Sequence, residues 1–258
     1  MKTTLIIQAR MGSSRLPGKV MKNLSGKPML EWVIRRGEQA KKIDETVVAT
    51  TTDPSDVAVA DWCEINSVPC YRGSTYDVLD RYYQTALWRG TDRIVRVTAD
   101  CPLIDPNVID DVVSLYETTG ADFAANRLPP PWHRTFPIGL DVEVVSFPLL
   151  ERAWKEADKP FEREHVMPWF YTPEGRFKVA ILDHDPDCGM HRWTADTPDD
   201  FELLQEIFRR LPDPLHASWT EVLKLVEQFP ELEQINETTH AKQVDAIDER
   251  ILRDKKTL

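Results

Sequence analysis

Short apolar runs recur through the first half of the chain, and stretches with helical periodicity separate them. The runs predict buried strands over residues 3–9, 46–51, 68–71 and 93–98. Helices are predicted over residues 28–42 and 76–89, and in the two segments that Asp53-Pro54 and Asp105-Pro106 open. Because strands that alternate with helices form parallel sheets covered on both faces, this pattern predicts an α/β fold with a mostly parallel sheet flanked by helices.

The pattern changes after residue 126. Residues 128–132 are rich in proline, which excludes them from a central strand. Further strands are predicted over residues 141–147 and 176–182, and further helices over residues 148–157, 161–171, 197–210 and 218–227. Since no segment is long enough to divide the chain, we expect residues 1–258 to form one domain. Residues 127–180 are expected to elaborate that domain, and residues 236–258 to form a charged tail.

Composition narrows the functional class. Of the 258 residues, 41% are hydrophobic and 29% are charged, as in a folded globular protein. The net charge of −11 argues against a general nucleic-acid partner, because phosphate backbones need a basic surface. The first apolar run stops at Gln8, too early for a secretory signal, and no run reaches the roughly 18 residues of a membrane helix, so we expect no membrane partner. Four cysteines without metal-type spacing indicate free thiols and a cytoplasmic location: Cys63, Cys70, Cys101 and Cys188.

The strongest chemical signal is the segment QARMGSSRLPGK, residues 8–19, which directly follows the first predicted strand. Small residues at Gly12, Ser13 and Ser14 let a backbone approach a phosphate closely. Three cations lie around them in an otherwise acidic protein: Arg10, Arg15 and Lys19. The spacing fits neither a Walker loop nor a dinucleotide fingerprint. Because open α/β sheets bind ligands at the carboxyl ends of their strands, the segment predicts a cradle for a di- or triphosphate, with a solvated basic turn as the alternative.

Two aspartates are candidates for a metal site. Asp100 follows the predicted strand over residues 93–98, where a carboxylate could hold Mg²⁺ against a nucleotide phosphate or simply form a turn. Asp196 precedes Thr197-Pro198, a common arrangement for a helix cap. The residues alone do not decide between a metal ligand and a turn residue for Asp100, and they favour the capping interpretation for Asp196. Distance along the chain does not tell whether the two lie together.

Taken in order, these motifs resemble the cytidylyltransferase family of CMP-Kdo synthetases, acylneuraminate cytidylyltransferases and the spore-coat polysaccharide biosynthesis protein F group. The resemblance spans about residues 1–210 and is closest to the spore-coat group. It rests on the segments over residues 9–19, 73–74, 77–82, 100–104, 137–143, 163–166 and 196–202.

The resemblance implies a glycosyltransferase-A-like nucleotidyltransferase fold and, usually, a homodimer formed through the middle segment. It implies transfer of CMP from CTP to a small-molecule acceptor in surface polysaccharide synthesis, with release of pyrophosphate. Mg²⁺, or Mn²⁺ in its place, is the expected cofactor at Asp100 and Asp196. The expected catalytic residues are Arg15, Lys19 and Asp100. The expected nucleotide-binding residues are Ala9, Arg10, Gly12, Ser13, Ser14, Arg15, Lys19, Arg72 and Thr98.

Recognition of the base and of the acceptor is less closely specified. Thr98 stands where CMP-Kdo synthetases carry a glutamine that helps to read the base, so Arg72 or the backbone of residues 72–74 is the expected substitute. The expected acceptor-binding residues are Asp141, Glu143, Glu164 and His165. The alternatives are a solvated strand edge for the first two, and helix packing or a subunit interface for the others. Three basic residues are further candidates for an acidic acceptor: Arg127, His133 and Arg134.

Two other functions compete with this one. A glycosyltransferase of related fold would use an Asp-x-Asp metal motif, which residues 183–187 match twice by letter. That function would leave the basic loop without a triphosphate to hold. A non-catalytic nucleotide-binding subunit is the second alternative, and the presence of Arg15, Lys19, Asp100 and Asp196 argues against it.

Overall fold

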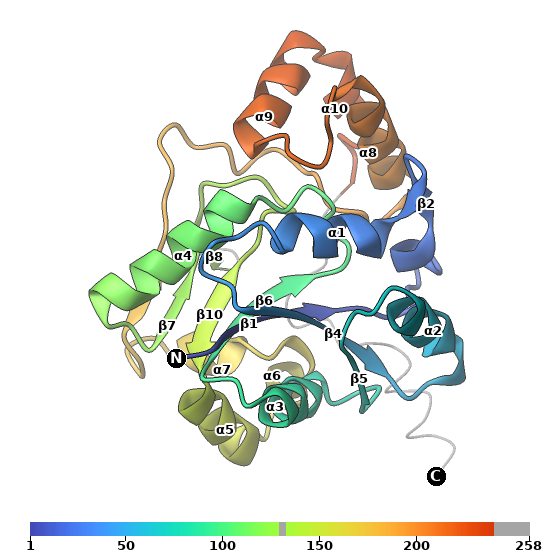
Figure 1. Ribbon diagram of the computed structural model, residues 1–258. Helices are drawn as coiled ribbons and strands as arrows, with labels where there is room; N and C mark the ends of the chain where they lie inside the picture. The colour runs from blue at the N-terminus through green and yellow to red at the C-terminus, as the bar shows by residue number, and fades with distance from the viewer. Residues whose placement is uncertain (129–132, 240–258) are drawn as a thin grey trace.

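A seven-stranded sheet forms the centre of the protein, and the computed structural model describes residues 1–128 and 133–239 (Figure 1). The strands follow the order β11-β7-β10-β6-β1-β4-β5. β10 runs antiparallel to its neighbours β6 and β7, whereas the other neighbouring pairs are parallel. This confirms the predicted mostly parallel α/β sheet. The strand bounds are β1 Thr3–Gln8, β4 Glu45–Thr51, β5 Cys70–Gly73, β6 Arg93–Thr98, β7 Phe123–Ala125, β10 Glu143–Ser146 and β11 Val179–Ile181.

Helices cover both faces of the sheet (Figure 1). Leu5 and Ile7 of β1 pack into one core with α1, α4, α8 and α9, and Ile6 between them faces a second core with α3, α5 and α7. In the described residues, no helix combines the length and the apolar character needed to cross a membrane. The helix bounds are α1 Met29–Gly37, α2 Val57–Ile65, α3 Val78–Arg89, α4 Pro106–Thr119, α5 Phe147–Glu156, α6 Pro160–His165, α7 Pro168–Tyr171, α8 Pro198–Arg210, α9 Trp219–Gln228 and α10 Glu231–Gln234.

The helix predicted over residues 28–42 is shorter in the structure, because α1 ends at Gly37. There the amide groups of Gln39 and Ala40 bond three residues back, to Arg36 and Gly37, which tightens the chain into a turn. A Cβ at Gly37 would come within 2.4 Å of Leu5 Cδ2. The glycine therefore lets the end of α1 lie directly against β1.

The single helix predicted over residues 161–171 is wrong. Val166 has a left-handed backbone with φ of 69°, and it separates α6 from α7. Pro168 then opens α7 at its first turn, where its missing N–H costs no hydrogen bond. Apolar residues continue across the break, so periodicity alone did not reveal it.

Several short elements were not predicted from the sequence. They are β2 (Asn23–Leu24), β3 (Lys27–Pro28), β7, β8 (Arg127–Leu128), β9 (His133–Arg134), α10 and a 3-10 turn, η1 (Lys19–Met21). The helix predicted to open at Asp53-Pro54 begins with a second 3-10 turn, η2 (Pro54–Asp56), which α2 follows. The proline-rich residues 129–132 and most of the expected tail, residues 240–258, lie outside the described part of the chain.

The sheet order places two of the sequence motifs at one edge. β1 pairs with β6 in parallel, with Gln8 opposite Thr98, and the amide of Ala99 donates to Gln8 O at 3.0 Å. The loop after β1 and the turn after β6 therefore leave the sheet side by side. This carboxyl edge is where open α/β sheets bind their ligands.

Candidate active site

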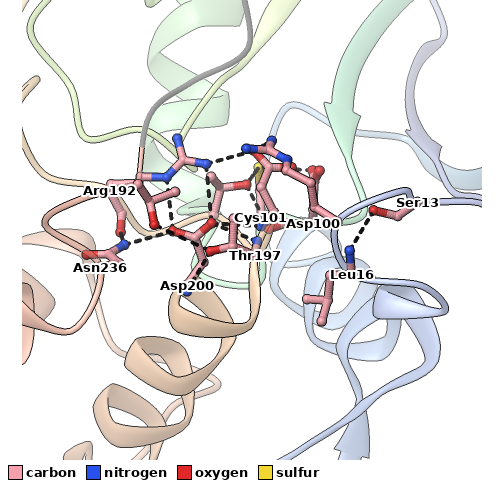
Figure 2. Close-up of polar contacts among 12 residues, drawn as sticks. Ser13, Leu16, Asp100, Cys101, Arg192, Thr197, Asp200 and Asn236 are labelled. Atoms are coloured by element: carbon pink, nitrogen blue, oxygen red, sulfur yellow. Dashed lines mark hydrogen bonds and ion pairs between the residues drawn. The ribbon is translucent and has the colours of Figure 1, made fainter. Parts of the chain in front are cut away.

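The loop after β1 is closed by its own backbone. Gly18 has a φ of 68°, which a glycine adopts without strain, and its amide donates to Met11 O at 2.9 Å. Inside the loop, Ser13 Oγ accepts a hydrogen bond from the Leu16 amide at 3.3 Å (Figure 2). The Met11 amide donates to Asp56 Oδ1, which anchors the loop to η2. Lys19 follows directly, at the start of η1.

Lys19 forms ion pairs with both aspartates that the sequence analysis gave as separate metal-site candidates. Its Nζ lies 2.7 Å from Asp100 Oδ2 and 2.9 Å from Asp196 Oδ1. Burial disfavours the charged ammonium, but the two carboxylates outweigh it and raise the pKa of Lys19 above its ordinary value. Burial likewise opposes the charge on Asp100, and Lys19 together with Thr98 lowers the pKa of that carboxyl. Lys19 and Asp100 are therefore charged at neutral pH.

Asp100 and Asp196 come together through backbone contacts. The amide of Ala195 donates to Asp100 O at 2.9 Å, and Thr194 Oγ1 donates to the same oxygen at 3.1 Å. These bonds fix the segment before α8 onto the turn after β6. Arg15 Nη2 adds a contact of 3.2 Å to Asp196 Oδ2 from the loop after β1.

Asp196 does not cap α8. Thr197 is the N-cap, and its side chain and that of Asp200 form a reciprocal capping box. The Asp196 carboxylate instead accepts from Arg192 Nη2 at 2.8 Å, and Arg192 Nε donates to Asp200 Oδ1 at 3.0 Å. Figure 2 shows Arg192, Thr197, Asp200 and Asn236 grouped beside Asp100.

Arg192 and Asp200 were missed by the sequence reasoning. The signal was present, because a Thr-x-x-Asp pattern at a helix start is typical of a capping box. Asn236 extends the group, since its Nδ2 donates to Asp200 Oδ1 at 2.9 Å and to Arg192 O at 3.1 Å. The segment after α10 thus contacts the residues that hold Asp196.

The residues expected near the base have partners within the protein. Arg72 Nε and Nη2 donate to the carbonyl oxygens of Thr51 and Asp53, at 2.9 and 3.1 Å. Thr98 Oγ1 donates to Asp100 Oδ1, and buried Ala9 donates its amide to Ala49 O at 3.2 Å. Arg72 therefore supports the loop after β4, and Thr98 orients Asp100.

Asp141 and Glu143 lie among arginines. Asp141 pairs with Arg134 at 2.6 Å and with Arg127 at 3.3 Å, and Glu143 pairs with Arg127 at 3.6 Å and with Arg96. Burial opposes the charge of Asp141, but these arginines lower the pKa of its carboxyl. Neither carboxylate lies on a solvated strand edge, and both are neutralised by guanidinium groups.

Glu164 and His165 line a cavity of about 110 Å³ beside the end of β1. The other residues that line it are Gln8, Arg10, Thr75, Tyr76, Val78 and Arg96. Burial, with Arg96 and Arg127 nearby, lowers the pKa of His165 to about 4, so the ring is neutral at neutral pH. Its buried Nε2 has no hydrogen-bond partner among the described residues. A small ligand in the cavity would supply one.

The donor set fits a magnesium ion that shares its ligands with a nucleotide. Mg²⁺ is usually bound by one or two carboxylates together with phosphate oxygens. Asp100 and Asp196 present two carboxylates toward a single cation, the Lys19 ammonium. In the part of the chain that the structure describes, no group of three or more His, Cys, Asp or Glu could enclose a metal ion.

Two aspartates of the Asp-x-Asp pattern in residues 183–187 contact other parts of the protein. Asp183 pairs with His133 at 2.8 Å, and the carboxylate of Asp187 accepts from the Gly189 amide at 2.7 Å. The strand before them, β11, is at the edge of the sheet, four places from β1 in the strand order. Position and contacts thus give no support to the glycosyltransferase alternative.

Comparison with known proteins finds relatives along almost the whole chain. A solved cytidylyltransferase from Leptospira borgpetersenii is 31% identical with a TM-score of 0.85, over 94% of this chain and 100% of that one. An uncharacterized protein of Methanocaldococcus jannaschii is 34% identical over 251 residues, 96% of this chain and 100% of that protein. The spore coat polysaccharide biosynthesis protein SpsF of Bacillus subtilis is 28% identical over 233 residues, 88% of this chain and 94% of that protein.

The Leptospira borgpetersenii structure confirms the nucleotidyltransferase fold that the resemblance implied. The family model of cytidylyltransferases matches residues 4–245 of the 258-residue chain. The protein therefore belongs to the cytidylyltransferase family.

Proposed function

We propose that the protein transfers CMP from CTP to a sugar acid, sugar phosphate or related acceptor, releases pyrophosphate, and serves surface polysaccharide synthesis. The observation that carries the proposal is the convergence of Lys19, Asp100 and Asp196 beside the basic loop after β1. The name of the SpsF relative supports the polysaccharide role.

The loop and its cations would hold the triphosphate. Arg10, Arg15 and Lys19 supply positive charge, and the backbone of residues 12–14 supplies amide groups close to the phosphates. An acceptor oxygen attacks the α-phosphorus while the bond to pyrophosphate breaks. Charge then develops on the leaving group, and Arg15 and Lys19 stabilise it there.

Asp100 and Asp196 would hold the metal, Mg²⁺ or Mn²⁺. When bound, the metal supplies neutralising charge to the α-phosphate and to the departing pyrophosphate. Thr98 keeps Asp100 oriented, and Arg192 holds Asp196 through an ion pair. Asp100, Arg15 and Lys19 are the residues on which we expect the rate to depend most.

The cavity beside Arg10 is the proposed acceptor site. Glu164 and His165 line it, and the Nε2 atom of His165 is one of the buried polar atoms that lack a hydrogen-bond partner among the described residues. For Asp141 and Glu143 we now propose an indirect role, because they hold Arg127 and Arg96 in place. Arg72 would act on base recognition through the loop that it supports.

A homodimer formed through residues 127–180 and a cytoplasmic location, where CTP is available, complete the proposal. Light scattering on the purified protein would give twice the chain mass of 29.7 kDa. A monomeric mass at micromolar concentration would contradict the dimer and leave the activity untouched.

The activity itself is tested by pyrophosphate release. Each of CTP, UTP, ATP and GTP is supplied with Mg²⁺ and a panel of sugar acids and sugar phosphates. We expect release with CTP and one class of acceptor, and its loss in Asp100→Asn. Turnover of another nucleotide would overturn the cytidylyl assignment.

A further inference from the structure

The Lys19 ammonium lies at the point where two carboxylates converge. Its side chain is 12% exposed, and Nζ contacts Asp100 at 2.7 Å and Asp196 at 2.9 Å. The proposed function assigns the same two carboxylates to a divalent metal, and the present inference rests on that assignment. Lys19 and the metal therefore compete for the same oxygen atoms.

The surrounding charges are balanced without any ligand. Asp196 pairs also with Arg15 and Arg192, and Arg192 pairs with Asp200. Contacts thus link three cations with three carboxylates: Lys19, Arg15 and Arg192 with Asp100, Asp196 and Asp200. Their formal charges cancel.

A divalent cation added to this cluster alone would leave an excess of two positive charges. Charges of one sign in a partly buried site repel strongly, because water screens them poorly. A triphosphate carries several negative charges and reverses the balance. It also offers phosphate oxygens to Lys19, whose ammonium would otherwise face the metal.

We propose that Lys19 is the internal counter-cation of the Asp100–Asp196 pair and gives up this position for the triphosphate of CTP, so that divalent metal enters together with the nucleotide. One side chain then serves two partners in turn. The free enzyme is kept from binding metal without substrate.

The test measures Mn²⁺ binding from the electron paramagnetic resonance signal of the free ion, first without nucleotide. Lys19→Met removes the competing charge, and we expect it to bind Mn²⁺ about tenfold or more tightly than the wild type. Lys19→Arg keeps the charge and is expected to bind Mn²⁺ as weakly as the wild type. Lys41→Met, at an exposed position after α1, is the matched control and is also expected to be unchanged.

The affinity of the same variant, Lys19→Met, for the nucleotide is expected to fall. By calorimetry, Lys19→Met should bind CTP with Mg²⁺ about tenfold or more weakly than the wild type. A variant that merely loosened the site would weaken both ligands. Thermal unfolding of each variant confirms that it is folded.

Equal Mn²⁺ affinity in wild type and Lys19→Met would overturn the proposed exchange, in which Lys19 leaves the two carboxylates for the triphosphate. A measurement on the wild type needs no variant, because CTP should raise its Mn²⁺ affinity at least about tenfold. Tight Mn²⁺ binding that CTP does not change would also overturn the exchange. No Mn²⁺ binding even with CTP would instead overturn the metal site of the proposed function.

Discussion

Lys19 Nζ lies 2.7 Å from Asp100 Oδ2, although 81 positions separate the two residues along the chain. The first residue ends the basic loop after β1, and the second follows β6 in the turn after the neighbouring strand. Their contact unites the cationic and the acidic motif in one site. Asp196 completes it from the segment before α8.

Asp100→Asn keeps the size of the side chain and removes its charge. We expect pyrophosphate release to slow by about 10²- to 10³-fold, because this is the usual rate effect of removing one positioned group that stabilises charge in the transition state. Release with saturating CTP and Mg²⁺ is the measurement. Asp199→Asn, at an exposed position in the first turn of α8, is the control and should retain its rate. Similar rates for wild type and Asp100→Asn would remove Asp100 from the mechanism.

Asp200 is expected to matter for stability. It is fully buried, and its carboxylate accepts hydrogen bonds from the side chains of Arg192 and Asn236 and from the amide of Thr197. Asp200→Ala leaves the buried guanidinium of Arg192 with one carboxylate instead of two. We expect a loss of about 3–5 kcal/mol in the free energy of unfolding, measured with urea at pH 7. The matched variant Asp199→Ala should lose less than about 1 kcal/mol, and equal losses would contradict this account.

His165 is expected to make stability depend on pH. Burial, the arginines Arg96, Arg127 and Arg10, and in the opposite direction Glu143, together lower the pKa of His165 from 6.5 to about 4. As pH falls below 6.5, the unfolded chain takes up a proton that the folded protein refuses. The stability that neutral His165 contributes is therefore complete above pH 6.5 and is lost as pH falls toward 4.

The measurement compares urea unfolding of the wild type and His165→Gln between pH 7 and pH 4.5. The wild type should lose stability faster than the variant, by up to about 1.4 kcal/mol per pH unit. Groups that titrate in both proteins cancel in the difference. Parallel curves would show that the ring is not held neutral.

Most helices and strands could be predicted from local sequence patterns, but the pairing of strands that are distant in the sequence could not. Residues 93–98 were predicted as a strand and form β6, and Asp105 and Thr197 cap the helices expected after them. Those signals lie within a few residues. The antiparallel direction of β10 depends on its pairing with β6 and β7, which no local pattern encodes.

The candidate site follows the same division. The basic loop was apparent from residues 8–19, because all its chemistry is contiguous in the chain. Asp196 was ambiguous until the backbone bond from Ala195 to Asp100 placed it beside Lys19. The ion pairs of Asp141 and Glu143 with arginines were likewise invisible, since strand alternation does not say what faces a side chain.

The central claim is that the loop after β1 binds CTP together with a divalent metal, and thermal unfolding tests it most directly. The protein is melted with CTP, UTP, ATP and GTP in turn, each with and without Mg²⁺. A ligand at a hundred times its dissociation constant adds about 2.7 kcal/mol, so we expect CTP with Mg²⁺ to raise the melting temperature by roughly 5–10 °C. No shift, or an equal shift with every nucleotide, would contradict the claim.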